Sequence, residues 1–527
     1  MATTQPVDGD SAGTFLGHPK GLFVLFFAEM WERFSYYGMR ALLIFYLTKH
    51  WLFSDSDAGI IYGAYTALVY ITPVVGGYLA DKYLGQRKAV LFGAVLLTLG
   101  HFFMAFEGQP AAGTENNPIV YVFWLALALI IVGSGFLKAN ISVIVGQLYP
   151  RTDTRRDAAY TIFYMGINLG AAIGSLLCGY IGETYGWAYG FGLAGIGMLA
   201  GLIVFMWGKP LLLGRGEPPK PLAKNTEFSM YGVGIAMVGV CWLAIQYQDM
   251  VGYVLGVFGG ALVLYVLFTA VVKLPSEERD RIFAAMFLIL TSIVFWALFE
   301  QAGSSLNLFT DRHVDRGGVP ASVFQSINAI YIILLAPIFA VVWQTLGRKG
   351  MEPSAPLKFG LGVVQVGLGF LVLVWGAQSV GMNAAVPVLF IFLIYLLHTT
   401  GELCLSPVGL SAMNRLAPSH MASLIMGTWF FASATGNFAA GLIAAATGAE
   451  GVGEESGKEV VLGVYSTVGW YAVAIGVGVM VISPLIKKLM HLDTLKDDTV
   501  GDDLLGQSEG PGEPQGAGIH PETRPAG

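Results

Sequence analysis

The chain has 527 residues, of which 55% are hydrophobic and 12% charged, and 69 are glycine. Soluble proteins carry roughly 25% charged residues and about 7% glycine. A long apolar chain rich in glycine is typical of bilayer helices, because small residues allow close helix packing in lipid. The composition therefore indicates an all-α polytopic membrane protein. It excludes soluble globular, disordered, collagen-like and disulfide-framework classes, and the net charge of −6 adds little.

Apolar runs of about 20 residues predict fourteen transmembrane helices. In chain order they cover 21–48, 57–80, 87–107, 119–147, 157–182, 188–208, 228–248, 251–273, 281–309, 321–346, 357–378, 386–413, 420–447 and 461–487. The first six form an N-terminal bundle over 21–208, and the last six form a C-terminal bundle over 281–487. A basic, Pro-rich cytoplasmic linker over 209–227 and two inserted helices over 228–273 lie between the bundles.

The positive-inside rule supports this count. With a cytoplasmic N-terminus, the inner connections hold 21 Lys and Arg residues, and the outer connections hold only Lys49, Arg312, Arg316 and Lys458. A missed helix would destroy this asymmetry. We therefore expect a multi-pass protein of the cell inner (plasma) membrane with both termini in the cytoplasm.

The ends of the chain and the cysteines carry few signals. Residues 1–20 are polar and lack the apolar core of a cleavable signal peptide, so the first span would act as its own insertion signal. Residues 492–527 are acidic and rich in Gly and Pro, which predicts a disordered cytoplasmic tail, with a regulatory tail as the alternative. The three cysteines lie in apolar runs without CxxC spacing, so we expect buried free thiols.

Two blocks of six helices suggest a pseudo-symmetric transporter with its site near the midplane between the halves. The loop after the second span, GYLADKYLGQRK, resembles the motif between helices 2 and 3 of the major facilitator superfamily. There, Gly77 would allow close helix packing, and Asp81 would pair with the basic cluster or cap a helix. Gly85 and Arg87 complete the pattern. A tight cytoplasmic turn with solvated charges is the alternative.

Some ionisable residues fall well inside the spans, where an isolated charge costs roughly 2.5–3.5 kcal/mol. They are Glu29, Glu32, Arg33, Arg40, Lys138, Glu300 and Glu402. Facing lipid, they would together cost on the order of 20 kcal/mol, more than a typical folding free energy. They must therefore face one another or water. Three bases and four acids leave one carboxylate over, and a carboxylate in a wet cavity can carry a proton.

The first span concentrates these charges on one side. At about 100° per residue, Glu29, Glu32, Arg33, Tyr36 and Arg40 fall within a stripe about 100° wide. Glu29 and Arg33 are four residues apart, which permits pairing along the helix. The stripe indicates a polar interior surface, and a buried ion pair that only fixes packing is the alternative.

Later spans also place polar residues about one turn apart. These sets are Trp296, Glu300, Ser304 and Asn307; Gln325, Asn328 and Tyr331; Glu402 and Ser406 before Pro407; and Trp429, Ser433 and Asn437. A single Asn or Ser often only links helices, but Glu300 and Glu402 do not fit that interpretation. With the bases in the first half and these acids in the second, the cavity would have walls of opposite charge. Such a cavity suits a zwitterion.

The segment EMWERFSYYG at 29–38 resembles the ExxERFxYYG motif of the proton-dependent oligopeptide transporters, a family of the major facilitator superfamily. FYMGINLG at 163–170 resembles their helix-five signature, and Glu300, Gln301 and Glu402 fit as well. The resemblance covers about 18–490, and the inserted helix pair is similar to that of prokaryotic members. It implies symport of di- and tripeptides with protons by alternating access, driven by the proton gradient without a cofactor. We expect a monomer in the bilayer with no nucleic-acid partner.

The resemblance also implies residue roles. Arg40 and Lys138 would receive the peptide carboxylate, and Asn168, Asn328 and Glu402 would hold its amine. Side-chain pockets would be lined by Tyr36, Tyr37, Tyr70, Trp296, Trp429 and Ser433. Proton coupling would involve Glu29, Glu32, Arg33 and Glu300. Arg40 with Glu300, and Lys138 with Glu402 or the first-span carboxylates, would exchange partners as the gates alternate.

One departure concerns helix four, where Ala139 replaces the proline that commonly follows the lysine in the family, which leaves the pose of Lys138 open. No histidine occurs between His50 and His101, so proton handling falls to carboxylates. A related carrier of nitrate or another small solute is the alternative function, although such carriers would be expected to lack the first-span carboxylates. An intramembrane enzyme would need a metal cluster or an activated nucleophile, and the sequence shows neither pattern.

Overall fold

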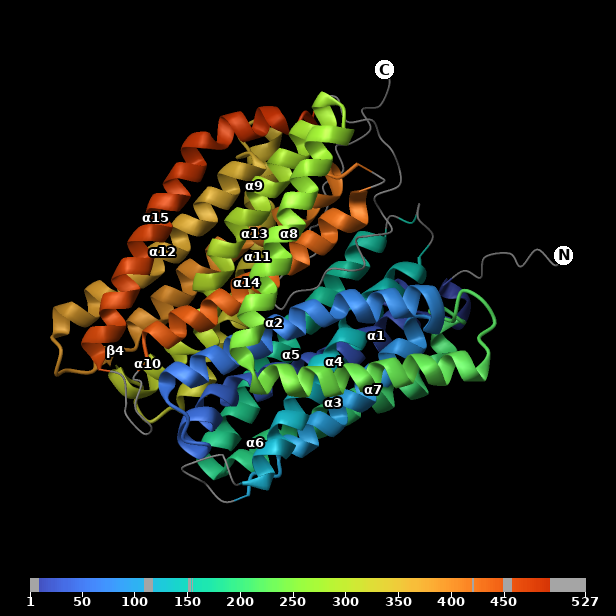
Figure 1. The fold of residues 1–527 in the computed structure, drawn as a ribbon, viewed down its shortest axis with the longest axis horizontal. Coiled ribbons are helices and arrows are strands. Elements are labelled where there is room, and N and C mark those ends of the chain that lie inside the picture. The colour runs from blue at the N-terminus through green and yellow to red at the C-terminus, as the bar shows by residue number, and fades with distance from the viewer. Residues whose placement is uncertain are drawn as a thin grey trace.

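The computed structural model describes residues 9–108, 117–149, 153, 155–418, 421–448 and 457–492, and it is almost entirely helical (Figure 1). The predicted disordered tail, apart from Leu492, lies outside the described residues. Two pairs of very short strands are the exception to the all-α prediction. They are β1 (Thr14–Phe15) with β2 (His18–Pro19), antiparallel, and β3 (Val314–Asp315) with β4 (Val386–Pro387), parallel.

The long helices follow the predicted spans. The first six are α1 (Lys20–Phe45), α2 (Asp55–Leu79), α3 (Gln86–Met104), α4 (Pro118–Gln147), α5 (Arg156–Tyr185) and α6 (Trp187–Trp207). The inserted pair is α7 (Lys224–Gln246) and α8 (Gln248–Lys273). The remaining long helices are α9 (Ser276–Phe299), α11 (Ser326–Arg348), α12 (Ala355–Val380), α13 (Leu389–Leu416), α14 (Ala422–Ala446) and α15 (Lys458–Leu489). Short elements are η1 (Gly9–Ala12), η2 (Tyr46–His50), η3 (Ala80–Leu84), η5 (Lys209–Leu212), η6 (Glu300–Gly303), α10 (Ser305–His313) and η7 (Ala321–Gln325).

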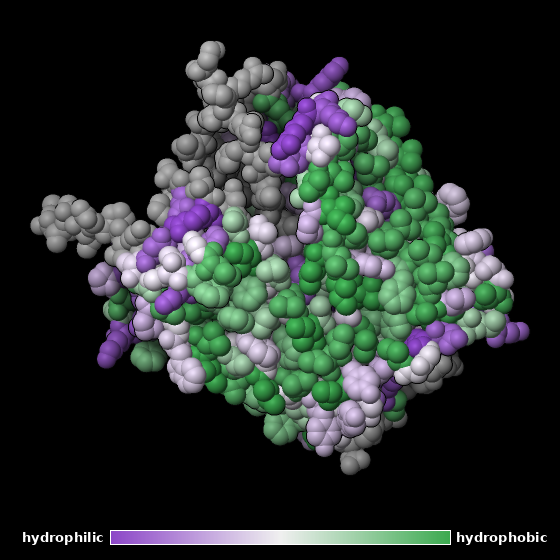
Figure 2. All heavy atoms as spheres, turned by 180° about the vertical axis from the view of Figure 1, so that it is seen from behind, coloured by the Kyte–Doolittle hydropathy of each residue, from purple (hydrophilic) through white to green (hydrophobic). Residues whose placement is uncertain are grey.

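Thirteen helices within the described part of the chain are long and apolar enough to cross a membrane. With α1, a helix of 26 residues that carries the charged stripe, they make up the fourteen that the sequence predicts. Hydrophobic residues cover most of the face shown in Figure 2, and hydrophilic residues gather toward its margins. Large exposed apolar surfaces are rare on soluble proteins, whereas the acyl chains of a bilayer would cover such a surface on a membrane protein. The protein is a polytopic helical membrane protein.

The predicted span 281–309 is wrong in one respect, because it is not one continuous helix. α9 ends at Phe299, the chain makes the 3₁₀ turn η6, and α10 begins at Ser305. The backbone angles of Ser304, φ −122° and ψ −101°, lie outside the helical region. Gly and Ser are weak helix formers, so the sequence around Gly303 tolerates this break. The break places Glu300 at a helix end that faces the other bundle.

The two bundles meet near α10 and β4 and diverge on the opposite side (Figure 1). α2 and α14 touch there through glycine, since a Cβ on Gly63 would lie 2.7 Å from Gly441 Cα. Six polar contacts between described residues also join the bundles. They are Arg40–Glu300, Lys49–Asp311, Arg312–Asp55, Asn307 and Gln325 to the Ala41 carbonyl, and Glu183 to the Ser322 amide. All six lie toward the end that contains the C-terminal part of α1 and the start of α2.

The inserted helices pack on different bundles. On α7, the Tyr231 ring lies 5.0 Å from the Phe92 ring of α3, and Trp242 Nε1 donates to the Tyr121 carbonyl of α4 at 3.2 Å. α8 instead packs against α14, where Gly252 lies against Phe438. Figure 1 shows the two helices separating from their shared turn, each along its own bundle.

Candidate functional site

A buried cluster of three ionisable side chains lies on α1. Arg33 Nε is 2.6 Å from Glu29 Oε1 and 3.0 Å from Glu32 Oε2. The pairing expected from the four-residue spacing of Glu29 and Arg33 is therefore present. All three side chains are at most 1% exposed. Two carboxylates around one guanidinium carry a net negative charge, and one proton would neutralise the cluster.

A second buried ion pair crosses the interface between the bundles. Arg40 Nη2 of α1 donates to Glu300 Oε2 at the break after α9. Arg40 Nε also donates to the Tyr62 hydroxyl of α2 at 2.6 Å, and its guanidinium carbon lies 5.8 Å from the Tyr37 ring centroid. The expected partner of Arg40 is thus confirmed, and the exchange of that partner stays a prediction.

Lys138 projects from α4 toward aromatic rings of α1 and α2. Its Nζ lies 4.8 Å from the Tyr70 ring centroid and 5.6 Å from that of Tyr36, close enough for cation–π attraction. Lys138 is 2% exposed and interacts electrostatically with Glu32. α4 continues through Ala139 without a break. Lys138 therefore extends the positive wall from an intact helix.

The negative wall of the second bundle centres on Glu402 of α13. Asn328 Nδ2 of α11 donates to Glu402 Oε2 and to Thr399 Oγ1, each at 3.0 Å. Glu402 is fully buried. Two of the three residues expected at the peptide amine thus meet, while Asn168 lies on α5 and donates to the Tyr164 carbonyl at 3.2 Å.

The residues expected to line side-chain pockets are buried, except Tyr37, which is partly buried. On α14, Ser433 Oγ donates to the Trp429 carbonyl at 3.2 Å, and Asn437 Nδ2 donates to the Ser433 carbonyl at 3.0 Å. The Tyr36 hydroxyl and Trp296 Nε1 make no hydrogen bond to any described residue. A buried donor without a hydrogen-bond acceptor lowers the folding stability by about 1–3 kcal/mol. These two atoms are therefore suited to donate to a ligand or to water.

Three residues expected on polar faces serve other contacts. Asn307 Nδ2 and Gln325 Nε2 donate to the Ala41 carbonyl at 3.1 and 3.4 Å, where they help to join the bundles. The Tyr331 hydroxyl donates to the Phe392 carbonyl at 3.3 Å. Gln325 belongs to η7 rather than to α11, so the shared face predicted for the span 321–346 is not formed as one helix surface.

The loop motif between α2 and α3 binds the linker. Gly85 has φ +74°, which a side chain would strain, and Gln86 Nε2 donates to Asp81 Oδ1 at 2.7 Å. Arg87 Nε lies 2.6 Å from Glu217 Oε1 of the linker, and this hydrogen bond lowers the pKa of the Glu217 carboxyl. The motif is therefore a clamp on the linker rather than a turn with solvated charges.

One expectation within this motif is wrong. A Cβ on Gly77 would meet only Ala139 Cβ, at 3.8 Å, which is an ordinary contact. The close approach occurs one residue earlier, because a Cβ on Gly76 would collide with the Gly135 carbonyl of α4. Neighbouring helix positions point about 100° apart, so of two adjacent glycines only Gly76 lies at the closest approach to α4.

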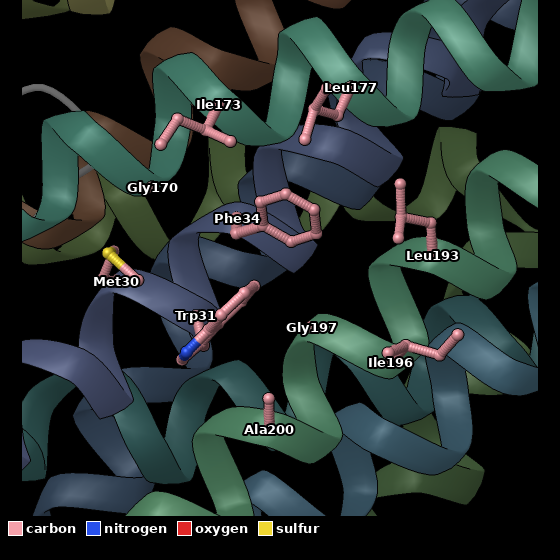
Figure 3. Close-up of a pocket in the computed structure, with 10 residues that line it drawn as sticks. All are labelled: Met30, Trp31, Phe34, Gly170, Ile173, Leu177, Leu193, Ile196, Gly197 and Ala200. Carbon is pink, nitrogen blue, oxygen red and sulfur yellow. The ribbon is translucent and has the colours of Figure 1, made fainter.

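A separate apolar pocket lies away from these residues. It has a volume of about 210 Å³ and lies between α1, α5 and α6, where only apolar side chains and glycines line it (Figure 3). Trp31 and Phe34, which border it, come from the face of α1 opposite to the charged stripe. Ile196 and Leu177 at its rim are exposed. The pocket is thus a lipid-facing groove and not the candidate site.

Several contacts of the site were not evident from the sequence. These contacts involve Tyr62, the Asp55–Arg312 pair and Glu217, which lie in apolar or loop segments where the residue spacing predicts no partner. Arg312 was expected only as an outer-loop charge. No group of three or more metal-ligating side chains occurs in the described part of the chain.

Comparison with known proteins places these features in context. A sequence model of the POT family matches residues 87–456. A peptide transporter of Yersinia enterocolitica is 38% identical over 82% of this chain and 88% of its own length. A di-/tripeptide transporter of Lactococcus lactis is 34% identical over 80% of this chain and 88% of its own. The crystal structure of a POT peptide transporter in complex with sulfate superposes with a TM-score of 0.79, at 35% identity, over 92% of this chain and 98% of that one.

Proposed function

Because this chain belongs to the POT family, we propose that it is a symporter that carries di- and tripeptides together with protons across the cell membrane. The arrangement of buried charge is the observation that carries the proposal. Arg40 and Lys138 lie on the first bundle, and Glu402 with Asn328 lies on the second. A peptide is a zwitterion with a carboxylate at one end and an ammonium group at the other, so it can bridge two such walls.

The fold supports alternating access. The bundles are joined by six polar contacts toward one end, and three of these are ion pairs: Arg40–Glu300, Arg312–Asp55 and Lys49–Asp311. With both termini in the cytoplasm, this joined end faces outward and the side on which the bundles diverge faces inward. Breaking these pairs and forming contacts at the other end would expose the site to the outside. The pairs therefore act as the outer gate.

Proton coupling rests on the buried carboxylates. Glu29 and Glu32 share Arg33, and Glu300 pairs with Arg40. A peptide carboxylate that binds Arg40 competes with Glu300, and a proton on Glu300 removes that competition. Proton and peptide would thus favour the same rearrangement. The carboxylates beside Arg33 also disfavour a nitrate or small-anion carrier, because they offset the positive charge that such a substrate requires.

Uptake by the purified protein in liposomes tests this function. With an inward proton gradient, labelled dialanine should accumulate above its external concentration, and a protonophore should abolish the accumulation. Unlabelled di- and tripeptides should compete, whereas nitrate and free alanine should not. Accumulation that is unaffected by the protonophore would exclude proton coupling, and competition by nitrate alone would favour the anion carrier.

A further inference from the structure

Tyr62 on α2 makes a contact that the charge pattern did not reveal. Its hydroxyl accepts a hydrogen bond from Arg40 Nε at 2.6 Å, and its ring centroid lies 5.8 Å from the guanidinium carbon. Tyr62 is 2% exposed and Arg40 is 7% exposed. A buried side chain of α2 thus contacts the guanidinium of α1 both through a hydrogen bond and through its ring.

The same hydroxyl packs against the break in the second bundle. A Cβ on Gly303 would collide with the Tyr62 hydroxyl oxygen and would lie 3.3 Å from Arg40 Nε. Gly303 is the last residue of η6, the turn that begins with Glu300. The glycine therefore lets the turn approach Arg40 and Tyr62 together, and no side chain fits between them.

The geometry of the guanidinium gives this contact a consequence. Its five N–H donors lie in one plane with fixed directions, so a bond at Nε restricts the orientation of the whole group. Nε is bound to Tyr62 while Nη2 is bound to Glu300. When Glu300 leaves, the bond at Nε can persist. The guanidinium then keeps its orientation while its Nη donors become available to another carboxylate.

We propose that Tyr62 is a positioning residue that holds Arg40 in place while Arg40 exchanges Glu300 for the carboxylate of the peptide. This inference rests on the proposed peptide transport, which assigns Arg40 to that carboxylate. Tyr62 itself need not touch the peptide. It sets the strength with which a free carboxylate is preferred over an uncharged C-terminus.

The test compares Tyr62→Phe with the unmodified protein in liposomes. The readout is the ratio of the inhibition constants of alanyl-alanine amide and dialanine against labelled dialanine uptake. A hydrogen bond to a charged group is worth roughly a factor of ten or more in binding. The ratio should therefore fall about tenfold in Tyr62→Phe, mainly because dialanine binds more weakly.

A matched control lies less than one turn further along α2. Tyr65 is equally buried, and its hydroxyl makes no hydrogen bond to any described residue. Tyr65→Phe should keep the ratio of the unmodified protein. In an Arg40→Lys background, Tyr62→Phe should lower dialanine affinity by less than twofold, because no guanidinium remains to be oriented. Equilibrium binding of dialanine to purified protein in detergent gives the same comparison if Tyr62→Phe impairs uptake itself.

The outcomes separate the two claims. An unchanged ratio in Tyr62→Phe, an equal fall in Tyr65→Phe, or a full tenfold loss in the Arg40→Lys background would overturn the role of Tyr62. Failure of the unmodified protein to accumulate dialanine would instead reject the proposed function.

Discussion

Arg40 of α1 and Glu300, at the break between α9 and α10, form a buried ion pair that joins the two bundles. Removal of one partner from such a pair leaves an uncompensated buried charge, which costs roughly 3–5 kcal/mol. The pair therefore stabilises the arrangement in which this end of the molecule is closed. It also lies where a substrate carboxylate would compete with Glu300.

Glu300→Gln should uncouple transport from the proton gradient, because the amide cannot titrate and binds Arg40 more weakly. We expect proton-driven accumulation of dialanine to fall more than tenfold, while exchange of dialanine at equal pH continues. The control is Glu352→Gln, which removes another ion pair. In that pair Glu352 Oε1 lies 2.5 Å from Lys358 Nζ, away from the contacts between the bundles. Accumulation by Glu300→Gln at the level of this control would contradict the role of the pair.

Glu32→Gln should separate the same two activities through the α1 cluster. Glu32 lies 3.0 Å from Arg33 and is fully buried, so an amide there removes both a charge and a protonation site. Exchange of dialanine should persist and accumulation should be lost. The measurement is uptake with and without an imposed proton gradient. If the variant still concentrates dialanine, Glu32 has no part in coupling.

Lys138→Gln should weaken binding of free-acid peptides, because Lys138 supplies positive charge beside Tyr36 and Tyr70. We expect the KM for dialanine to rise about tenfold, which corresponds to about 1.4 kcal/mol of binding. Inhibition by alanyl-alanine amide should change little in the same assay. Equal weakening of both compounds would show that Lys138 acts on packing and not on the carboxylate.

Glu402→Gln should affect the other end of the peptide. Glu402 accepts a hydrogen bond from Asn328 and is fully buried, so its charge is positioned for an ammonium group. Dialanine should bind about tenfold more weakly, whereas N-acetyl-dialanine should bind as it does to the unmodified protein. Competition assays measure both. A parallel loss for the acetylated compound would remove Glu402 from amine binding.

The linker clamp gives a prediction for stability against pH. Arg87 holds the pKa of Glu217 below its usual range, so the pair stabilises the folded protein above the unfolded-state value of about 4.3. That contribution is lost as pH falls through the lowered folded value. Glu217→Gln should thus decrease Tm slightly at pH 7, and this decrease should shrink and vanish as pH falls from 7 through the lowered pKa of Glu217. A Tm difference that is constant over this range would contradict the assignment.

Much of this architecture follows from local sequence rules. Span length, loop charge and the four-residue spacing of Glu29 and Arg33 depend only on neighbouring residues. The partner of Arg40 came from a family resemblance, not from spacing. Contacts such as Tyr62 to Arg40 and Arg312 to Asp55 join segments that are distant in the sequence, so they cannot be predicted from the periodicity of one helix. The helix break at Ser304 depends likewise on what the neighbouring bundle can accommodate.

Competition by blocked peptides in the unmodified protein tests the central claim, that two walls of opposite charge hold the two ends of one peptide. Labelled dialanine uptake would be measured against unlabelled dialanine, its C-terminal amide and its N-acetyl derivative. We predict that dialanine inhibits strongly, and that each singly blocked compound inhibits at least tenfold more weakly. Equal inhibition by all three compounds would contradict the account.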